Sequence, residues 1–318
     1  MSPLFRRRSA DEKAADQADA QARREGTERS AERAAASLAQ LEAGHIPLAA
    51  SERLAQFAQS GADVFSSDLT VSEWSALARL GAAPITQVMG SSIYHVGWQP
   101  TYFNVPTEVQ MLSDAYNECR RLALGRLLEE AAACSADAVV GVRIEEGAHD
   151  WAAGAVEFIA VGTAVRLPDK LRAGRGALLT DLTCQEFVLL CNAGMRPVGI
   201  AAHTSVHYVP ATYQTQMAQG SFGASWVNQE FGDFTRGVYE AREKAVSSVS
   251  AQARALGGDG IVGVDITQSA RTYEVRRGIV ESKDLEVTFH VMGTVIREDP
   301  SLAVDPASPP VLQVLSLR

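Results

Sequence analysis

Cysteines, long apolar runs and excess positive charge are all scarce in this sequence, and each scarcity argues against a class of protein. Four cysteines occur in 318 residues, without any C-x-x-C pair, and they are Cys119, Cys134, Cys184 and Cys191. Scattered thiols of this kind are typical of a reduced, cytoplasmic protein. No apolar run approaches the roughly 20 residues that a membrane helix requires. The net charge of −9 argues against nucleic acid as a partner, because phosphates demand a basic face.

Motifs for targeting and for common enzyme chemistry are also missing. Arginines at positions 6–8 are not followed by an apolar segment, so no secretory signal is expected. The sequence shows no Ser-His-Asp order, phosphate loop or dinucleotide-binding glycine pattern. We therefore expect a protein that is not an enzyme and that lies in the cytoplasm.

The first 45 residues are predicted to form a charged, alanine-rich helical arm. Residues 9–40 contain no proline and one glycine, and their apolar residues are nearly all alanine until Leu38 and Leu41. A helix without a strong apolar stripe suits a solvated arm, although a coiled-coil or partner-binding helix stays open. Residues 46–67 are expected to add a short helix and a linker.

The rest of the chain carries an internal duplication. The segment DLTVSEWSALARLGAAP at 68–84 is echoed by DLTCQEFVLLCNAGMRP at 181–197. Each copy predicts a helix that begins with a capping box, Thr70 with Glu73 and Thr183 with Glu186, and that ends near a glycine. A proline follows each glycine, and strands are expected at 85–96 and 198–209.

A long helix and two further strands complete each copy. The helix leads into SADAVVGVRI at 135–144 and into GGDGIVGVDI at 257–266. Glycines at 141 and 263 are expected to let the returning strand lie close under the helix. Final strands are predicted at 156–165 and 287–296, and the second copy has nine extra residues in its hairpin. The predicted parts are a first repeat at 68–168, a linker at 169–180, a second repeat at 181–299 and a tail at 300–318.

The second repeat resembles the YbjQ-like family, which is described as heavy-metal-binding. The resemblance is carried by Ala241, Arg242, Glu243, the run QARALG at 252–257, Asp259, Gly263 and Asp265, with departures at Gly258 and Gly260. The first repeat keeps Arg120, Asp137, Gly141 and GTAV at 162–165. It has Arg121 and Arg143 where the family has acids, so it lacks the acidic groups at those two positions.

This resemblance implies an α/β (α+β) fold made of two tandem dodecin-like, two-layer β-α-β-β units. It also implies association into rings, with five units per ring, whereas each chain carries two. Three chains could make one six-unit ring, or five chains could stack two five-unit rings. Divergence between the copies at Glu243/Arg121 and Asp265/Arg143 favours the second arrangement, a homo-oligomer of five chains.

Two histidines and four charged residues are the candidate site residues. His203 and His207 lie four apart in a predicted strand and so share a face, which could begin a transition-metal site. Their separation of about 13 Å, however, is too long for one ion unless a bulge or a second copy intervenes. Arg120, Arg242, Asp259 and Asp265 are candidates for an anion site or for contacts between subunits. For Asp259 and its counterpart Asp137, turn formation is the alternative, and no cofactor other than a metal is expected.

The tail combines prolines with an apolar, β-prone end. Its candidate partner-binding residues are Val311, Leu312, Val314, Leu315 and Leu317, and strand addition to a sheet edge is the expected mode. A disordered end is the alternative. The sequence therefore predicts an oligomeric assembly or scaffold protein that recruits a protein partner or cargo through its arm and tail. A protein that binds metal or a small ligand between subunits is the alternative.

Overall fold

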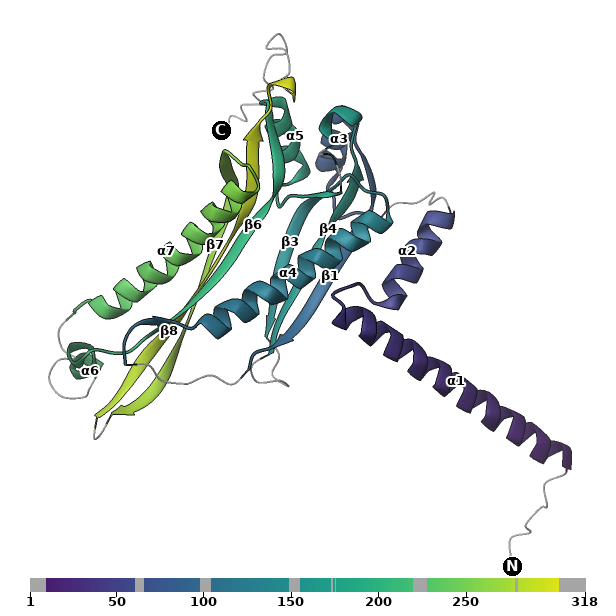
Figure 1. The fold of residues 1–318 in the computed structure, drawn as a ribbon, viewed down its shortest axis with the longest axis horizontal. Helices are drawn as coiled ribbons and strands as arrows, with labels where there is room; N and C mark the ends of the chain where they lie inside the picture. The colour runs from purple at the N-terminus through teal and green to yellow at the C-terminus, as the bar shows by residue number, and fades with distance from the viewer. Residues whose placement is uncertain are drawn as a thin grey trace, which may run out of the picture.

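Two sheets with long helices across one face make up most of the molecule (Figure 1). The computed structural model describes residues 10–60, 66–97, 104–148, 155–172, 174, 176–219, 228–277 and 280–302. The fold is α+β, as the sequence predicts. Among the described helices, none combines the length and apolar content that crossing a membrane requires.

The N-terminal arm is helical, as predicted. Helix α1 (Ala10–Glu42) projects away from both sheets, and α2 (Leu48–Ser60) folds back toward them (Figure 1). The turn between them is anchored, since Ile46 and Leu54 are buried in the core of the first repeat. Arg53 of α2 also forms an ion pair with the buried Glu130 at 3.0 Å.

The first repeat begins with the short helix α3 (Val71–Leu80) and the strand β1 (Ala83–His95). The short strand β2 (Thr107–Glu108) leads into the long helix α4 (Gln110–Ala133). Strands β3 (Ala138–Ala148) and β4 (Ala155–Arg166) complete the repeat, and the 3-10 helix η1 (Asp169–Leu171) follows.

The second repeat has the same order of main elements. They are β5 (Leu178–Leu179), α5 (Cys184–Asn192), β6 (Met195–Val209), α6 (Tyr213–Gln219), α7 (Gly232–Ala255), β7 (Gly260–Arg277), β8 (Val280–Glu298) and the 3-10 helix η3 (Pro300–Leu302). The strand orders are β1-β4-β3-β5 and β2-β6-β8-β7. Three antiparallel strands therefore occur in the same order in both repeats, which confirms the duplication.

One of the two outer strands of each sheet comes from outside the repeat that supplies the other three. Strand β5 lies in the segment expected to be a linker, and it pairs in parallel with β3 of the first repeat. Strand β2 of the first repeat pairs antiparallel with β6 of the second. The two repeats are thereby joined edge to edge through two separate strand contacts.

Both predicted capping boxes are present. The hydroxyl of Thr70 accepts from the backbone N–H of Glu73, and Thr183 does the same with Glu186. The glutamates return the contact to the backbone N–H of the threonines at 2.8 and 2.9 Å. These reciprocal bonds fix where α3 and α5 begin.

The prolines after these helices lie inside strands rather than ahead of them. Pro84 and Pro197 belong to β1 and β6, each at a register shift between the proline and the residue two positions later. A bulge accommodates a residue that has no N–H to donate to the ladder. The strands accordingly begin slightly earlier than the sequence predicted.

The explanation expected for Gly141 and Gly263 is wrong. Both have positive φ angles, 63° and 64°, and both sit in a bulge of the returning strand. A Cβ atom at Gly141 would meet nothing within 4 Å, so close approach to the helix does not explain it. That approach occurs at Gly90, where a Cβ would lie 2.0 Å from the carbonyl oxygen of Ala123 in α4.

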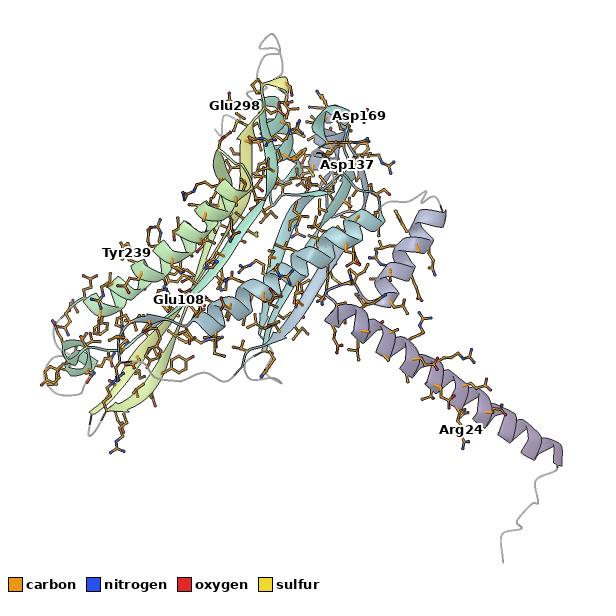
Figure 2. All side chains as sticks on the ribbon, in the orientation of Figure 1. Arg24, Glu108, Asp137, Asp169, Tyr239 and Glu298 are labelled. Atoms are coloured by element: carbon orange, nitrogen blue, oxygen red, sulfur yellow. The ribbon has the colours of Figure 1, made fainter. Side chains whose placement is uncertain are left out.

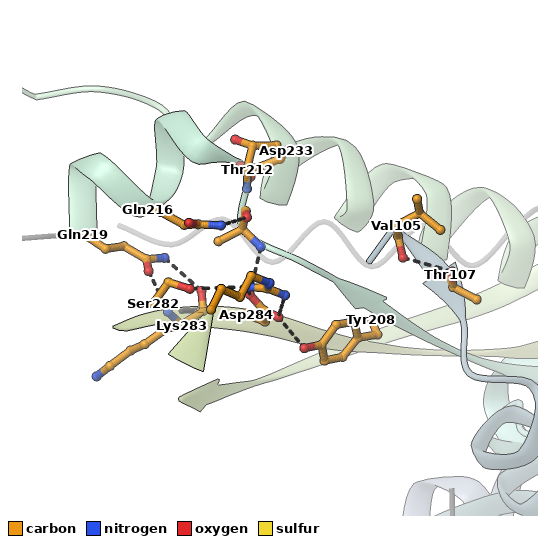
Figure 3. Close-up of polar contacts among 12 residues, drawn as sticks. Val105, Thr107, Tyr208, Thr212, Gln216, Gln219, Asp233, Ser282, Lys283 and Asp284 are labelled. Carbon is orange, nitrogen blue, oxygen red and sulfur yellow. Dashed lines mark hydrogen bonds and ion pairs between the residues drawn. The ribbon is translucent and has the colours of Figure 1, made fainter. Parts of the chain in front are cut away.

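The second repeat extends its β7–β8 hairpin, and a buried acid fastens the extension to the repeat (Figure 3). Asp284 is fully buried; it accepts from Arg277 Nη1 at 2.9 Å, from Ala211 N–H at 2.9 Å and from the hydroxyl of Tyr208. Burial alone would raise the pKa of Asp284, but the hydrogen bonds from Arg277 and Tyr208 hold it below its usual value. The extension is therefore tied to β6 through an ionised carboxylate.

The turns that follow the long helices generate a stability prediction. Ser135 after α4 has a φ of 56°, whereas its counterpart after α7 is Gly257 at 70°. Because a side chain in this region is strained, Ser135→Gly should raise the free energy of unfolding by about 1 kcal/mol. Gly257→Ser should lower it by a similar amount. Urea denaturation of both variants tests this, and equal stability of all three proteins would contradict it.

Candidate functional site

A small cavity of about 200 Å³ lies at the junction of the two repeats. Its polar and aromatic lining comes from both: Arg120 of α4, Glu146 of β3 and Phe158 of β4, with Asp265 and Thr267 of β7 and His290 of β8. The cavity therefore exists only because the strand exchange holds the repeats together. Of the residues predicted from sequence, it contains Arg120 and Asp265.

Arg120 is the buried cation of this junction, with 5% of its surface exposed. Its guanidinium donates to Asn117 Oδ1 at 3.1 Å and to the hydroxyl of Thr204, which belongs to β6 of the other repeat. The group also lies 4.9 Å from the ring centre of Phe158, in cation–π geometry. Burial lowers the pKa of Arg120 to about 10, so the side chain stays charged at neutral pH.

A chain of hydrogen bonds leads from Arg120 through Thr204 and His290 to Glu146. The hydroxyl of Thr204 lies 2.9 Å from His290 Nδ1, and His290 Nε2 lies 3.1 Å from Glu146 Oε2. Burial, followed by the charge of Arg120, lowers the pKa of His290 to about 4, so its ring is neutral at pH 7. Since Thr204 accepts from Arg120, its own proton goes to Nδ1, and the ring donates from Nε2 to Glu146.

Aromatic rings enclose this chain of hydrogen bonds, which we call the Arg120–Glu146 relay. Tyr116 stacks edge-on to His290, with 5.3 Å between ring centres, and Phe158 lies 6.5 Å from the same ring. Burial raises the pKa of both Glu146 and Tyr116. The rings reduce access of water, which strengthens the polar bonds among the residues between them.

This arrangement is suited to holding a junction or a small polar molecule. It presents one guanidinium, a neutral imidazole and the carboxyl groups of Glu146 and Asp265 around a small volume. Arg120, Thr204 and His290 already hydrogen-bond one another, which restricts what else they can contact. No activated nucleophile lies among the six lining residues named above.

The two predicted metal-ligand histidines lie elsewhere, on the face of β6 that α7 covers. The Nε2 atoms of His203 and His207 are buried and have no hydrogen-bond partner in the described chain. Ser205 Oγ and Glu108 Oε1 are also buried, and they too have no partner there. Glu108 lies in β2, two residues before α4 begins (Figure 2). Burial lowers the pKa of His203 and of His207, so both imidazoles are neutral and could act as donors or acceptors.

These residues do not make a metal site within one copy of the chain. Residues four apart along a strand are separated by about 13 Å, which one ion cannot bridge. Within the described residues, no three His, Cys, Asp or Glu side chains are grouped closely enough to hold an ion. A site completed by a second copy, as anticipated from the sequence, stays a prediction.

The other charged candidates are not gathered in the cavity. Arg242 is exposed on α7, and in the described part of the chain it has no hydrogen-bond or ion-pair partner. Asp259 stands at the corner between α7 and β7, where its Oδ2 atom accepts from the backbone N–H of Glu298 at 2.9 Å. Asp137 accepts from the N–H of Leu167 in the same way. Both aspartates therefore provide turn contacts, the alternative considered for them.

The remaining candidates have simpler outcomes. Val311, Leu312, Val314, Leu315 and Leu317 lie outside the described residues. Cys184 and Cys191 are buried in an apolar cluster with Leu77 and Phe187, as core cysteines, and burial raises the pKa of Cys191 to about 11. Neither thiol is placed to react.

Sequence reasoning missed His290, Thr204, Glu146 and Phe158. A signal for His290 did exist, since a lone histidine occupies a strand position where the first repeat has Ile159. The counterpart of Thr204 in the first repeat is Ser91, which also carries a hydroxyl, so the comparison of the two repeats does not single out Thr204. No pattern within one repeat, however, indicates that these residues meet Arg120, because the contact crosses from one repeat to the other.

Comparison with known proteins places these features in a family. The family model described as "Putative heavy-metal-binding" (YbjQ) matches residues 103–168 and 215–295, one segment in each repeat. The chain is similar to the encapsulin nanocompartment protein Rv1762c of Mycobacterium tuberculosis, with 34% identity over 254 residues, which are 78% of this chain and 90% of that protein. It is also similar to a UPF0145 protein of Clostridium perfringens, with 37% identity over 62 residues, 20% of this chain and 57% of that protein. No solved structure gives a significant match, so the dodecin likeness stays a prediction.

The low pKa of His290 predicts how stability depends on pH. An unfolded histidine binds its proton near pH 6.5, whereas folded His290 binds it only near pH 4. The contribution of the neutral ring is thus complete above pH 6.5 and is lost as the pH falls toward 4, by an amount of the order of 3 kcal/mol. His290→Gln should flatten this part of the pH–stability curve in urea denaturation. The exposed His45→Gln serves as control, and an unchanged slope in His290→Gln would contradict the assignment.

Proposed function

The chain belongs to the YbjQ family, and we propose that it is a self-assembling scaffold without enzymatic activity that associates with an encapsulin nanocompartment. The observation that carries the assembly role is the exchange of edge strands between repeats, in which β5 pairs with β3 and β2 pairs with β6. Such pairing is a means of joining one unit to the next. Applied between chains, it builds a homo-oligomer.

The size of the units supports assembly. Each repeat contributes one long helix over three antiparallel strands, and a unit of this size has little core of its own. Inside the chain the missing burial comes from the other repeat, as when Val206 and Tyr208 of β6 pack against Val109 and Leu112 near the start of α4. At the opposite end of the first repeat the α1–α2 turn supplies cover, whereas β7 of the second repeat has no further strand beside it in the described chain.

The proposed partner follows from the similarity to the encapsulin nanocompartment protein, which extends over 78% of this chain. Two segments outside the repeats are available to reach a partner. Helix α1 stands clear of the sheets (Figure 1), and the tail ends in the apolar sequence VLQVLSL. We infer that the tail adds as a strand to an edge of the compartment protein, while the arm spaces the assembly from it.

Deletion of residues 311–318 tests the recruitment role. The full chain should co-elute with purified encapsulin shell protein in size-exclusion chromatography, and the deletion should abolish co-elution while leaving the mass of the assembly unchanged. A double variant, Leu312→Ser with Leu315→Ser, should reproduce the loss, and Ser316→Ala is the matched control. Failure of the full chain to bind, or binding that survives the deletion, would contradict this role for the tail.

A second candidate function is binding of a transition metal between copies. The observation that favours it is the pair of buried Nε2 atoms on His203 and His207, which have no hydrogen-bond partner in the described chain and lie near Glu108. Because α7 covers this face of β6 within one copy, a ligand from a second copy would reach the two atoms only if α7 moved away from β6. This candidate predicts that protein purified without an affinity tag contains stoichiometric metal by elemental analysis. Zn²⁺ titrated by calorimetry should bind the wild type, fail to bind His203→Ala and still bind His45→Ala, a variant of an exposed histidine. Metal-free protein that does not bind Zn²⁺ would rule out this candidate.

A further inference from the structure

We propose that residues 311–315 of the tail pair in parallel with the free edge of β7 in the same chain, as residues 178–182 pair with β3. The second sheet then has an outer strand on that side from its own chain. This pairing goes beyond the recruitment role proposed above and does not depend on it, since it involves one chain alone. The tail lies outside the described residues, and the surface that receives it lies within them.

The first repeat supplies the template, because the chain that leaves its last strand returns to the edge of the same sheet. After β4 the chain forms η1, and β5 then runs in parallel beside β3. The second repeat continues in the same way as far as the structure describes it, since η3 follows β8. Residues 300–302 of η3 lie 131 positions after residues 169–171 of η1, the same offset that separates the two predicted final strands. The next element of the template is the strand that pairs with the sheet.

Four backbone hydrogen bonds of 2.9 to 3.0 Å hold residues 178–182 against β3. Two N–H groups of the returning segment donate to carbonyls of the edge, and two N–H groups in the bulge of the edge, those of Gly141 and Val142, donate back. Both N–H groups of the bulge therefore point away from β4. The four bonds are Leu178 N–H to Asp137, Thr180 N–H to Val139, Gly141 N–H to Leu182 and Val142 N–H to Thr180.

Strand β7 offers the same backbone groups on an open edge. Its bulge at Gly263 matches the bulge at Gly141, with φ angles of 64° and 63°. Because the backbone follows the same path there, the N–H groups of Gly263 and Val264 point to the outer edge. The carbonyls of Asp259 and Ile261 face the same way. No further strand lies beside β7 in the described chain, and an edge of this kind is a template for an added strand.

Exposed apolar side chains mark the same edge. Val264 is 48% exposed, whereas its counterpart Val142 is 1% exposed and belongs to one buried cluster with Leu179 of β5. Ile266, two positions farther along the same face of β7, is 42% exposed. No equivalent of β5 lies over Val264 in the described chain. Apolar groups on an open edge indicate that another segment covers them.

The tail carries the apolar pattern of the segment that pairs in the first repeat. Residues 178–182 read LLTDL, and residues 311–315 read VLQVL. The three leucines of the first segment are buried, and apolar residues occupy the same three places in the tail. Two prolines come directly before Val311, where the lack of an N–H removes no bond to the sheet.

The connection to the tail is long enough to reach β7. Glu298, at the end of β8, donates its N–H to the side chain of Asp259 directly before β7 begins (Figure 2). Leu302, the last described residue, lies four positions beyond this contact. Eight residues then separate Leu302 from Val311, whereas the template uses six between η1 and β5. Eight extended residues span about 26 Å, so the tail can start beside the first residues of β7.

The outer edge of the first sheet, by contrast, is already covered. The α1–α2 turn lies against β1, where the guanidinium of Arg126 donates to the carbonyls of Ser91, Leu41 and His45 at 2.6, 3.0 and 3.2 Å. Strand β1 is thus closed to the tail, whereas β7 is open to it.

Tethering favours the tail of the same chain over the tail of a second copy. A short linker gives the tail an effective concentration on the order of 1 mM at its own β7. A second copy at micromolar concentration competes poorly with a segment held in this way.

Pairing with β7 has a consequence for recruitment. The tail residues that pair with β7 are those proposed above to add to the compartment protein, so the two contacts exclude each other. The affinity of the tail for a shell protein is therefore reduced in proportion to the fraction of chains whose tail is released from β7. Binding of a shell protein in turn uncovers the edge of β7.

A disulfide within one chain tests the pairing and its register. In the template Ala138 is paired with Leu178. Their counterparts are Gly260 and Val311, so Gly260→Cys with Val311→Cys should form a disulfide on mild oxidation, detected by peptide mass spectrometry. A Cβ atom at Gly260 meets nothing closer than 3.7 Å, and the four native cysteines are buried. The matched control, Gly260→Cys with Leu315→Cys, separates the thiols by about 13 Å in the proposed pairing and should react about 10-fold more slowly.

Hydrogen exchange measures the same pairing without added thiols. The amide hydrogens of Gly263 and Val264 should exchange about 10-fold more slowly in the full chain than in a chain without its last eight residues. Leu312→Ser with Leu315→Ser should reproduce the fast exchange, because it removes two of the three apolar contacts. Ser316→Ala, outside the paired residues, should exchange as the wild type does.

The outcomes separate this pairing from the recruitment role. Equal rates for the two cysteine pairs, a disulfide-linked dimer of 68 kDa, twice the 34.0 kDa of one chain, or amide exchange that the deletion leaves unchanged would overturn the pairing. Oxidised Gly260→Cys with Val311→Cys should not co-elute with encapsulin shell protein and should do so again after reduction. If the disulfide forms in register and the oxidised protein still co-elutes, the pairing with β7 stands and the recruitment role of the tail fails.

Discussion

Edge-strand exchange is the constraint on which this structure depends. The segment that leads into the second repeat completes the sheet of the first, and the segment that leads into α4 completes the sheet of the second. Because these lead-ins run directly into α4 and α5, contact with the other repeat positions the start of both helices. The end of the connection, Leu178–Leu179, is accordingly part of the sheet of the first repeat.

The exchange also explains why one arginine is buried and its counterpart is not. Arg120 and Arg242 occupy equivalent positions, yet only Arg120 meets a neighbouring repeat, through the hydroxyl of Thr204. Asn117 and the ring of Phe158, both of its own repeat, complete its contacts. A buried cation is costly unless its hydrogen bonds are satisfied. The relay through His290 to Glu146 provides that compensation and ties β8 to β3.

Local features of the fold could be predicted from the sequence because their causes are local. The capping boxes at Thr70 and Thr183 and the corner aspartates depend on residues a few positions apart or on one hairpin. The internal duplication also predicted that both repeats have the same strand order, because similar sequences fold in the same way. The cavity could not be predicted, since His290 and Glu146 come together only through packing of one repeat on the other. His203 and His207 looked like ligands because a strand pattern shows which face a residue takes, but not what covers that face.

The hairpin of β7 and β8 makes the two repeats distinguishable despite their shared fold. It is 18 and 19 residues long on its two strands, whereas β3 and β4 have 11 and 12. The buried Asp284 network holds this extra length as a firm projection. A partner that binds the extended hairpin therefore binds once per chain rather than once per repeat. Because the hairpin lies in the second repeat alone, such a partner also distinguishes one end of the molecule from the other. The extended hairpin thus gives a polarity to a chain whose two repeats otherwise share one fold.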